Sequence, residues 1–514
     1  MRAIAGGAER GPIVAVTIAA SSLLLLVLTT AAGLPTAEVA MLLTGFAVVA
    51  LGYRTLLLWQ SQLVFLLLVI LFIPIKRYEL PGNLPFDMEP YRAVVIVVMA
   101  GWLVSLLVDP RVRIRHSGMG GPLALIAMAS LFSVVVNPTR IDELMVGGEV
   151  VKSLMFLASY LLVFYLVVSV IRGVDQVRRL VQVLVIGGAI VAFFALIEAQ
   201  TGFNVFDRLA NLVPVLSLKE AIGEGTTRSG RLRVFASGQG PIAIGAAMAM
   251  LLPLAISMAM TSAKRARWWI CAGLLAMGGL ATGSRTSVVM IGVVLLVFLW
   301  LKPAFTRKTV AVLLIPAIIG VHIVLPGTIG SLRSSFFPEG GLIAEQSKNP
   351  GWRGSGRLAD VGPTFDEFLA QPLLGQGYGT RVTGRGAESN ALILDNQWLK
   401  TLVETGALGA FAYLWLFIRF ARRMAPIAKE DEGERGWYVT AFAASALAFA
   451  CGMFFYDAFS FIQVTFLMYI MLALGSVLLT VPEVARSRAR ATAPRRATRR
   501  VARPPGGMPA PGQI

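Results

Sequence analysis

Four short stretches place polar side chains beside long apolar segments, where ionisable groups are costly. Three of them carry arginine, and the fourth carries acidic side chains. An arginine fork makes bidentate, charge-assisted hydrogen bonds to phosphate and stays protonated, so these arginines indicate a diphosphate held near headgroup depth. A carboxylate at the rim of an outward cavity could act as a general base on a sugar hydroxyl. The stretches are RSGRLRVFASGQGPIAIG (228–245), ATGSRTSVV (281–289), GSGRLADVG (354–362) and LDNQWLKTLVETGALG (394–409).

The strongest single candidate among the arginines is Arg285, because it is expected at the tip of a very tight hairpin between two apolar helices. A loop of that kind needs no charge of its own. Arg228, Arg231, Arg233 and Arg357 are weaker candidates. The alternative for them is that arginines near a bilayer simply extend their head groups to the interface.

The acidic stretch begins with Asp395 and Asn396 at the start of an apolar helix. Asp395 is a candidate base, but an aspartate in this position is also a good helix cap. Glu404 is a further candidate for substrate binding, with the alternative that it pairs with Lys400 four residues earlier. Asn396 would contribute to substrate binding beside Asp395.

The elements that must position these residues are membrane helices. Of the 514 residues, 56% are hydrophobic and 14% charged, against roughly 25% charged in soluble chains. Apolar runs near the ~20 residues that cross a bilayer recur throughout. We predict an all-α polytopic membrane protein with 12–14 spans, two of which (38–52 and 268–283) are short. The fourteen candidate spans are 13–34, 38–52, 55–75, 92–108, 122–136, 150–171, 180–198, 238–261, 268–283, 286–301, 309–326, 397–419, 437–456 and 458–481.

Charge sets the expected orientation, because basic loops stay in the cytoplasm. Alternate connections and the C-terminal tail hold 28 of the 46 Lys and Arg but 8 of the 28 Asp and Glu. We therefore expect both termini to lie in the cytoplasm. The tail is expected to be disordered and to lie near anionic lipid, with nucleic-acid binding as the alternative.

Two long outer connections divide the expected spans. The chain would comprise N-terminal helices (1–179), helices with a first outer loop near 199–237 (180–326), a large outer loop before the third-last span (327–396), C-terminal helices (397–481) and the tail (482–514). The large loop contains VGPTFDEFLAQPLLGQGYG, which predicts a short amphipathic helix ended by Pro372 and a glycine-rich turn.

The sequence has no Walker A pattern and no His/Cys cluster of zinc-binding type. We therefore expect neither a metal nor another cofactor.

The same stretches resemble motifs of the bacterial O-antigen ligase and O-antigen polymerase superfamily of membrane glycosyltransferases. Asp395-Asn396 is followed by nine residues and then Gly406-x-x-Gly409, the ligase spacing with Asp in place of His. Arg233, Pro241 and Gly245 match an arginine segment entering a span, with Ala236 where Gly is usual. GSRTS matches a third motif, and GRLADVGPTFDEFLAQPLLGQGYG, with Arg357 at its head and the glycine-rich turn at its end, matches a fourth. The resemblance is best over about 180–480.

The resemblance implies transfer of an oligosaccharide from a polyprenyl-diphosphate carrier to an acceptor hydroxyl. Arg285 would stabilise the diphosphate, and Pro241, Gly406 and Gly409 would have structural roles. Asp395 in place of His is closer to the polymerases, so polymerisation of a surface polysaccharide is favoured and ligation to a lipid or protein acceptor is the alternative. Expected partners are the lipid-linked donor, a glycan or lipid acceptor, membrane lipids and other polysaccharide-assembly proteins. A transporter or flippase with an arginine-lined cavity, or a non-catalytic scaffold, remains open.

Overall fold

The computed structural model of the chain describes residues 58–80, 88–110, 112–213, 215–219, 227–228, 231–328, 330, 333, 336–337, 361–382 and 394–480. The expected spans at 13–34 and 38–52, the residue Arg357 and the tail 482–514 lie outside the described residues.

The described part of the chain consists mainly of apolar helices, as predicted. Twelve of the fourteen expected spans fall in it, and each of these twelve contains one helix. Seven are long and apolar enough to cross a membrane, and α3, α5 and α12 are shorter apolar helices. These findings confirm an all-α, multi-pass membrane protein. The twelve helices are α3 (Trp59–Phe72), α4 (Pro90–Val108), α5 (Gly120–Val135), α7 (Gly147–Val170), α8 (Val174–Thr201), α10 (Pro241–Thr261), α11 (Arg265–Ala281), α12 (Arg285–Leu301), α13 (Pro303–Val324), α17 (Gln397–Glu430), α18 (Glu434–Gly452) and α19 (Ile462–Thr480).

Helix ends follow local sequence signals. Proline opens α4, α10 and α13, where its missing N–H costs no hydrogen bond and its fixed φ suits a helix. Gly202, at φ 73°, ends α8. The main difference from expectation is α17, which continues to Glu430 rather than ending near 419. The added residues 420–430, FARRMAPIAKE, are mostly good helix formers apart from Pro426, and most of them lie beyond the apolar part of the span.

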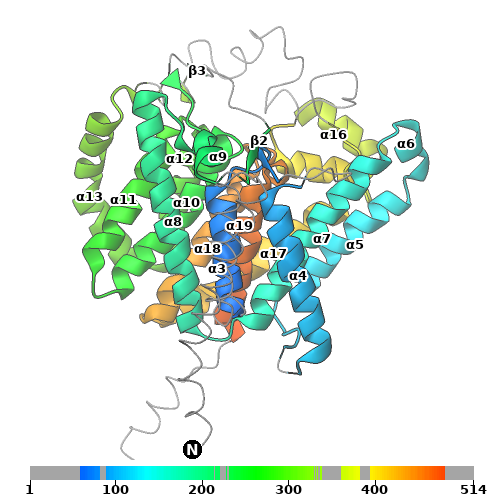
Figure 1. Cartoon of the computed structure of the whole chain (residues 1–514), viewed down its shortest axis with the longest axis horizontal. Helices are drawn as coiled ribbons and strands as arrows, with labels where there is room; N and C mark the ends of the chain where they lie inside the picture. Colours follow the sequence, from blue (N-terminus) through cyan, green and yellow to red (C-terminus); the bar gives the residue numbers. More distant parts are fainter. Residues whose placement is uncertain are drawn as a thin grey trace, which may run out of the picture. The chain divides into compact units, whose positions relative to one another are not determined.

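Successive helices run in opposite directions (Figure 1). The expected outer connections meet at one end of the helices, which we call the outer end. Arg77, after α3, bonds to Gly238, before α10, and Gln397, at the start of α17, bonds to Met453, after α18. At the opposite end Lys302 bonds to Asp431, so the predicted alternation of connections is present.

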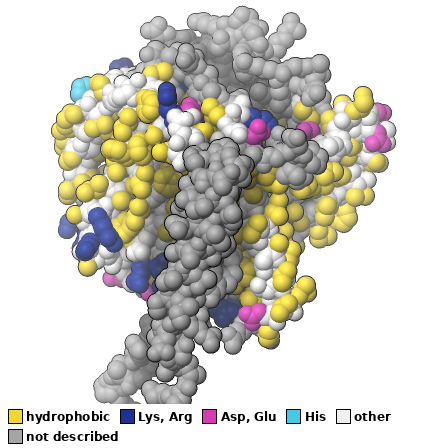
Figure 2. Space-filling view, in the orientation of Figure 1, with side chains coloured by type: hydrophobic (Ala, Val, Ile, Leu, Met, Phe, Trp, Pro, Cys, Tyr) yellow, Lys and Arg dark blue, Asp and Glu magenta, His cyan; other side chains and the backbone are white. Residues whose placement is uncertain are grey.

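The core lies around α10 and α19, whose apolar stretches are 89% and 94% buried within the protein, whereas that of α13 is 6% buried. Small residues allow these helices to pack closely. A side chain at Gly278 would meet Ala192 of α8, and one at Gly475 would meet Phe420 of α17. On the face shown in Figure 2, hydrophobic side chains cover the helices and charged ones gather near helix ends.

The outer end also carries short elements. The first outer loop contains the turns η1 (Val205–Arg208) and α9 (Leu209–Leu212). Strand β1 (Tyr78–Glu79) pairs antiparallel with β2 (Ser217–Leu218), and β3 (Thr227–Arg228) with β4 (Arg231–Leu232). The short helices α6 (Pro138–Glu143) and α16 (Val361–Ala370) and the turn η2 (Ala458–Ser460) complete it. Helix α16 confirms the amphipathic helix predicted in the large outer loop.

Candidate functional site

The first turn of α17 is capped by Asn396 and not by the preceding residue, Asp395. The Asn396 side chain accepts hydrogen bonds from the backbone N–H groups of Trp398 at 3.0 Å and Leu399 at 3.2 Å. Asn396 is therefore the N-cap, the role that was the alternative explanation for Asp395. Asp395 lies immediately outside the helix and is half-buried, so its carboxylate is not the group that caps α17.

Helix α17 is interrupted at Gly406, which has φ 67° and ψ −169°. This left-handed value favours glycine, because a Cβ there crowds the backbone. Gly406 lies nine residues after Gln397, or roughly 14 Å along the helix axis. The break therefore falls well inside the apolar segment. Gly409 is needed for a different reason, since a Cβ there would overlap the side chain of Thr405.

The glycine-rich turn of the outer loop fills the break in α17. The N–H groups of Gln376 and Gly377 donate to the carbonyls of Val403 and Glu404 at 2.8 and 3.2 Å. In return, the N–H groups of Ala407 and Leu408 donate to the carbonyls of Pro372 and Leu373 at 2.8 and 3.3 Å. Irregular backbone at membrane depth must be satisfied by other parts of the protein, and the turn 371–377 supplies this need. Side chains from the end of α5 secure it, because Asn137 donates to the Gly375 carbonyl at 2.9 Å.

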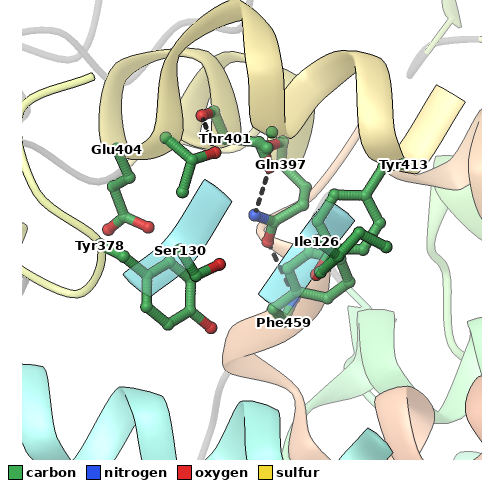
Figure 3. Close-up of a pocket in the computed structure, with 10 residues that line it drawn as sticks. Ile126, Ser130, Tyr378, Gln397, Thr401, Glu404, Tyr413 and Phe459 are labelled. Carbon is green, nitrogen blue, oxygen red and sulfur yellow. Dashed lines mark hydrogen bonds between the residues drawn. The ribbon is translucent and has the colours of Figure 1, made fainter. Parts of the chain in front are cut away.

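Glu404 lies beneath this turn, and 4% of its surface is exposed. Its side chain faces Tyr378 across a small cavity lined by α5, α17, the turn and η2 (Figure 3). Its Oε1 is buried with no hydrogen-bond partner among the described residues. Glu404 lies seven residues into α17, or roughly 10 Å along the helix axis from the end that Asp395 precedes.

Lys400 does not form the ion pair with Glu404 that was the alternative explanation for that carboxylate. Its ammonium group instead lies 3.0 Å from Asp457 in the connection between α18 and α19. Both side chains are mostly buried, with exposures of 16% and 11%. A lysine side chain one turn above Glu404 reaches across to the facing connection, which an analysis of helical spacing alone does not reveal.

The hairpin of Arg285 is as tight as predicted, because only residues 282–284 separate α11 from α12. Gly283 has φ 62° and lets the chain reverse. Arg285 is the first residue of α12 and is half-buried. The hairpin packs on the first turn of α10, since Ser287 donates to the Gly245 carbonyl at 3.2 Å and a Cβ at Gly245 would crowd Thr282.

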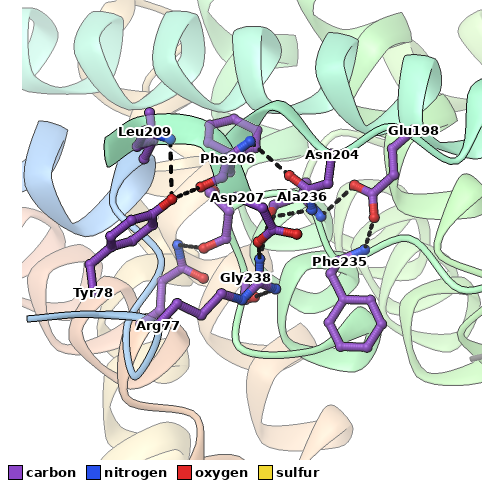
Figure 4. Close-up of polar contacts among 12 residues, drawn as sticks. Arg77, Tyr78, Glu198, Asn204, Phe206, Asp207, Leu209, Phe235, Ala236 and Gly238 are labelled. Carbon is purple, nitrogen blue, oxygen red and sulfur yellow. Dashed lines mark hydrogen bonds and ion pairs between the residues drawn. The ribbon is translucent and has the colours of Figure 1, made fainter. Parts of the chain in front are cut away.

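Arg233 is half-buried in the segment between β4 and Pro241, which opens α10. The following residues are held by side chains from three other places in the chain, which belong to Glu198, Asn204 and Arg77 (Figure 4). Glu198, at the end of α8, accepts from the N–H groups of Phe235 and Ala236 at 2.9 and 2.8 Å. Arg77 donates to the Gly238 carbonyl at 2.7 Å and lies 2.9 Å from Asp207. Burial lowers the pKa of Arg77 from its ordinary value, and Asp207 opposes that change.

Ala236 is a buried residue at φ 45°. An L side chain in the left-handed region costs about 1 kcal/mol relative to glycine, which accounts for the glycine common at this position in the resembled motif. We predict that Ala236→Gly raises the free energy of unfolding by about 0.5–1 kcal/mol. Thermal unfolding of the purified protein in detergent measures this, and an unchanged or lower melting temperature would contradict it.

The α18–α19 connection, 453–461, joins the predicted stretches. The N–H of Gln397 donates to the carbonyl of Met453 at 2.7 Å, and its side chain accepts from Phe459 at 2.9 Å. A Cβ at Gly240, before α10, would lie 3.5 Å from Phe461. The starts of α10 and α17 therefore meet around this connection. Arg231 lies in β4, and its side chain is outside the described part of the structure.

Sequence reasoning missed Arg77, Glu198, Asp207 and Asp457. Two of them could have been noticed in the sequence, because Glu198 and Asp457 are lone acidic residues in the apolar runs FFALIEAQ and MFFYDAFSF. Among the described residues, no group of three His, Cys, Asp or Glu side chains is placed to share a metal ion.

Residues 270–414 match the family described as O-antigen ligase. The matched region contains Arg285, Asp395, Asn396 and the break at Gly406, while Arg233 lies before it. This match, over residues 270–414 of the 514-residue chain, supports the resemblance to the O-antigen ligase and polymerase superfamily. No curated protein matches the chain. The family indicates a membrane glycosyltransferase of ligase or polymerase type, with a lipid-linked oligosaccharide donor and a glycan acceptor in general terms.

Proposed function

We propose that this protein moves an oligosaccharide from a polyprenyl-diphosphate carrier to an acceptor hydroxyl at the outer face of the bacterial inner membrane, and that it thereby polymerises a surface polysaccharide. The observation that carries the proposal is Arg285 at the first position of α12. A helix start combines free N–H groups with a positive dipole end, which suits an anion. An arginine there adds a bidentate phosphate ligand.

In the proposed reaction the acceptor oxygen bonds to the anomeric carbon of the donor sugar. The bond from that carbon to the diphosphate oxygen breaks, and polyprenyl diphosphate leaves with the electron pair. Arg285 and Arg233 stabilise the charge that grows on the diphosphate, with Arg231 and Arg357 as further ligands. The acceptor proton goes to the carboxylate of Asp395. Arginines neutralise the diphosphate in this scheme, so we propose that transfer needs no metal ion.

Asn396 lies beside Asp395 at the start of α17, and we propose that it contacts the acceptor sugar as well as capping the helix. Glu404 keeps an indirect part in this scheme. Its buried position under the 371–377 turn fits support of the substrate-binding end of α17 better than contact with sugar. Both termini are proposed to lie in the cytoplasm, opposite the outer end.

Asp395→Asn is predicted to slow glycan transfer by about 10²-fold. This is the lower end for general-base catalysis, because a diphosphate leaving group already makes departure easy. Since Asn396 caps α17, the melting temperature should stay within about a degree of wild type. Initial transfer rates in liposomes, measured beside melting curves, check both parts. A wild-type rate would remove Asp395 from the base role.

The overall function is tested by reconstituting the full chain in liposomes with lipid-linked oligosaccharide from its host and measuring product masses. A ladder of oligosaccharide multiples would support polymerisation. A single unit on another acceptor would identify the ligase alternative. Unchanged masses with an intact donor pool would refute glycosyl transfer.

The broken helix gives the transport alternative one specific point in its favour, because transporters often bind substrates at such breaks. An unbroken set of helices would have argued against transport, but α17 is interrupted at Gly406. However, the backbone groups at this break bond to the 371–377 turn instead of being left for a passing solute. In the same liposomes, donor movement across the bilayer without any change in product mass would favour transport.

A further inference from the structure

We infer that Glu198 and Arg77 act as positioning residues for Arg233, by clamping the peptide segment 235–238 that follows it; this inference rests on the proposed function. The clamp consists of side chains from the end of α8 and from the turn after α3. Neither side chain is assigned a part in the transfer reaction above.

The segment needs such a clamp because it is buried but irregular. Val234, Ala236, Ser237 and Gly238 are buried, yet they belong to no helix or strand. Buried backbone groups require partners. Four of them find charged ones, namely the N–H groups of Phe235 and Ala236 on Glu198 and the carbonyls of Ala236 and Gly238 on Arg77.

The peptide groups of Ala236 are held from both sides. Its N–H donates to Glu198 at 2.8 Å, and its carbonyl accepts from Asn204 at 3.1 Å and from Arg77 at 3.3 Å. This arrangement holds Ala236 at its unfavourable φ of 45°. Strained backbone persists where the surroundings over-determine it, and such places cluster at ligand sites.

The clamp is itself fixed in place. Arg77 bonds to Asp207 at 2.9 Å, and its guanidinium lies over the ring of Phe235 with 5.5 Å to the centroid. The neighbouring Tyr78 donates to the Phe206 carbonyl at 2.8 Å and accepts from Leu209 at 3.1 Å. Arg233 is two residues from the first clamped N–H group. Its backbone position therefore depends on Glu198.

The substitution Glu198→Gln tests the clamp. A glutamine keeps the shape but offers one acceptor oxygen, and its NH₂ group faces the second backbone N–H. In the full-length protein in detergent, we expect binding of a fluorescent polyprenyl diphosphate to weaken by roughly 3- to 10-fold. Arg233→Ala should weaken it by about 10-fold or more. The matched control is Asp175→Asn at the other end of α8, where an exposed aspartate pairs with Arg178; it should bind as wild type.

The double variant decides whether Glu198 acts through Arg233. Residues that act on one interaction show non-additive effects. Glu198→Gln in the Arg233→Ala background should therefore add little, and the double variant should bind like Arg233→Ala alone. The inference would be overturned if the fold losses of the two single variants multiply in the double variant. Wild-type binding by Glu198→Gln alone would overturn it as well. Wild-type binding by Arg233→Ala would instead count against the proposed function of that arginine.

A second variant covers the case in which Glu198→Gln does not fold, as judged by its melting curve. Arg77→Lys keeps the positive charge and loses the planar fork that joins Ala236, Gly238 and Asp207. The same cycle with Arg233→Ala should again be non-additive, and additive losses would overturn the inference.

Discussion

Replacing Arg285 with alanine is expected to slow glycan transfer by roughly 10²- to 10³-fold, the loss typical of removing one preorganised group that stabilises developing negative charge. Arg285 is the first residue of α12 at the outer end, where the helix dipole and the guanidinium would act together on the proposed diphosphate. The fold should persist, because the turn 282–284 is held by its own bonds, among them Thr282 to the Gly279 carbonyl at 2.8 Å. Initial rates in liposomes and melting curves measure the two parts separately.

The chain offers a close control for this variant. Arg265 is also the first residue of an apolar helix, α11, but at the opposite end of the bundle, and it is exposed. Arg265→Ala should transfer at the wild-type rate. Arg285→Lys should recover part of the loss, since it restores charge without the bidentate fork. Equal transfer rates for the Arg285 and Arg265 alanine variants would show that the Arg285 side chain has no specific role in transfer.

Gly406→Ala is expected to destabilise the protein by roughly 2–4 kcal/mol, and more if the turn 371–377 is displaced. The alanine would be held at a left-handed φ, and its Cβ would overlap the backbone of Leu373 and Leu374. Neither the turn 371–377 nor the break in α17 can move away without breaking the hydrogen bonds that join them. The thermal unfolding midpoint in detergent, and the yield of folded protein, report this loss.

Gly292 in α12 provides the comparison for Gly406, because nothing lies within 4 Å of a Cβ added there. Gly292→Ala should be neutral or stabilising by up to about 1 kcal/mol, as alanine is the better helix former. If both alanine variants melt at the wild-type temperature, the break at Gly406 does not carry the packing described above.

Much of the fold could be predicted because the bilayer imposes a simple rule on sequence. Runs of about 20 apolar residues must form helices, and the twelve expected spans that the structure describes do so. The tight turn before Arg285 and the short helix α16 were also predictable, since their ends coincide with Gly and Pro. The length of α17 was not, because its last turns are amphipathic and carry Arg419, Arg422 and Arg423.

The site was predictable only where it depends on local spacing. Asp395 and Asn396 are both good caps, and a shift of one residue in the helix start decides between them. Lys400 had a plausible partner within its own helix, and nothing in the sequence indicates that Asp457, 57 residues later, is the one it meets. The bonds from Glu198 and Arg77 to backbone groups are likewise invisible, because any residue could supply the N–H or carbonyl they use.

The pairing between the 371–377 turn and the break in α17 has a consequence for motion. Lifting the turn would expose the carbonyls of Val403 and Glu404 and the N–H groups of Ala407 and Leu408 together, and each unsatisfied group in hydrocarbon costs several kcal/mol. The two segments must therefore open as one cooperative unit of local unfolding or not at all. The outer loop is anchored at this point as firmly as a helix, so any rearrangement of the folded protein has to leave the turn 371–377 in place on α17.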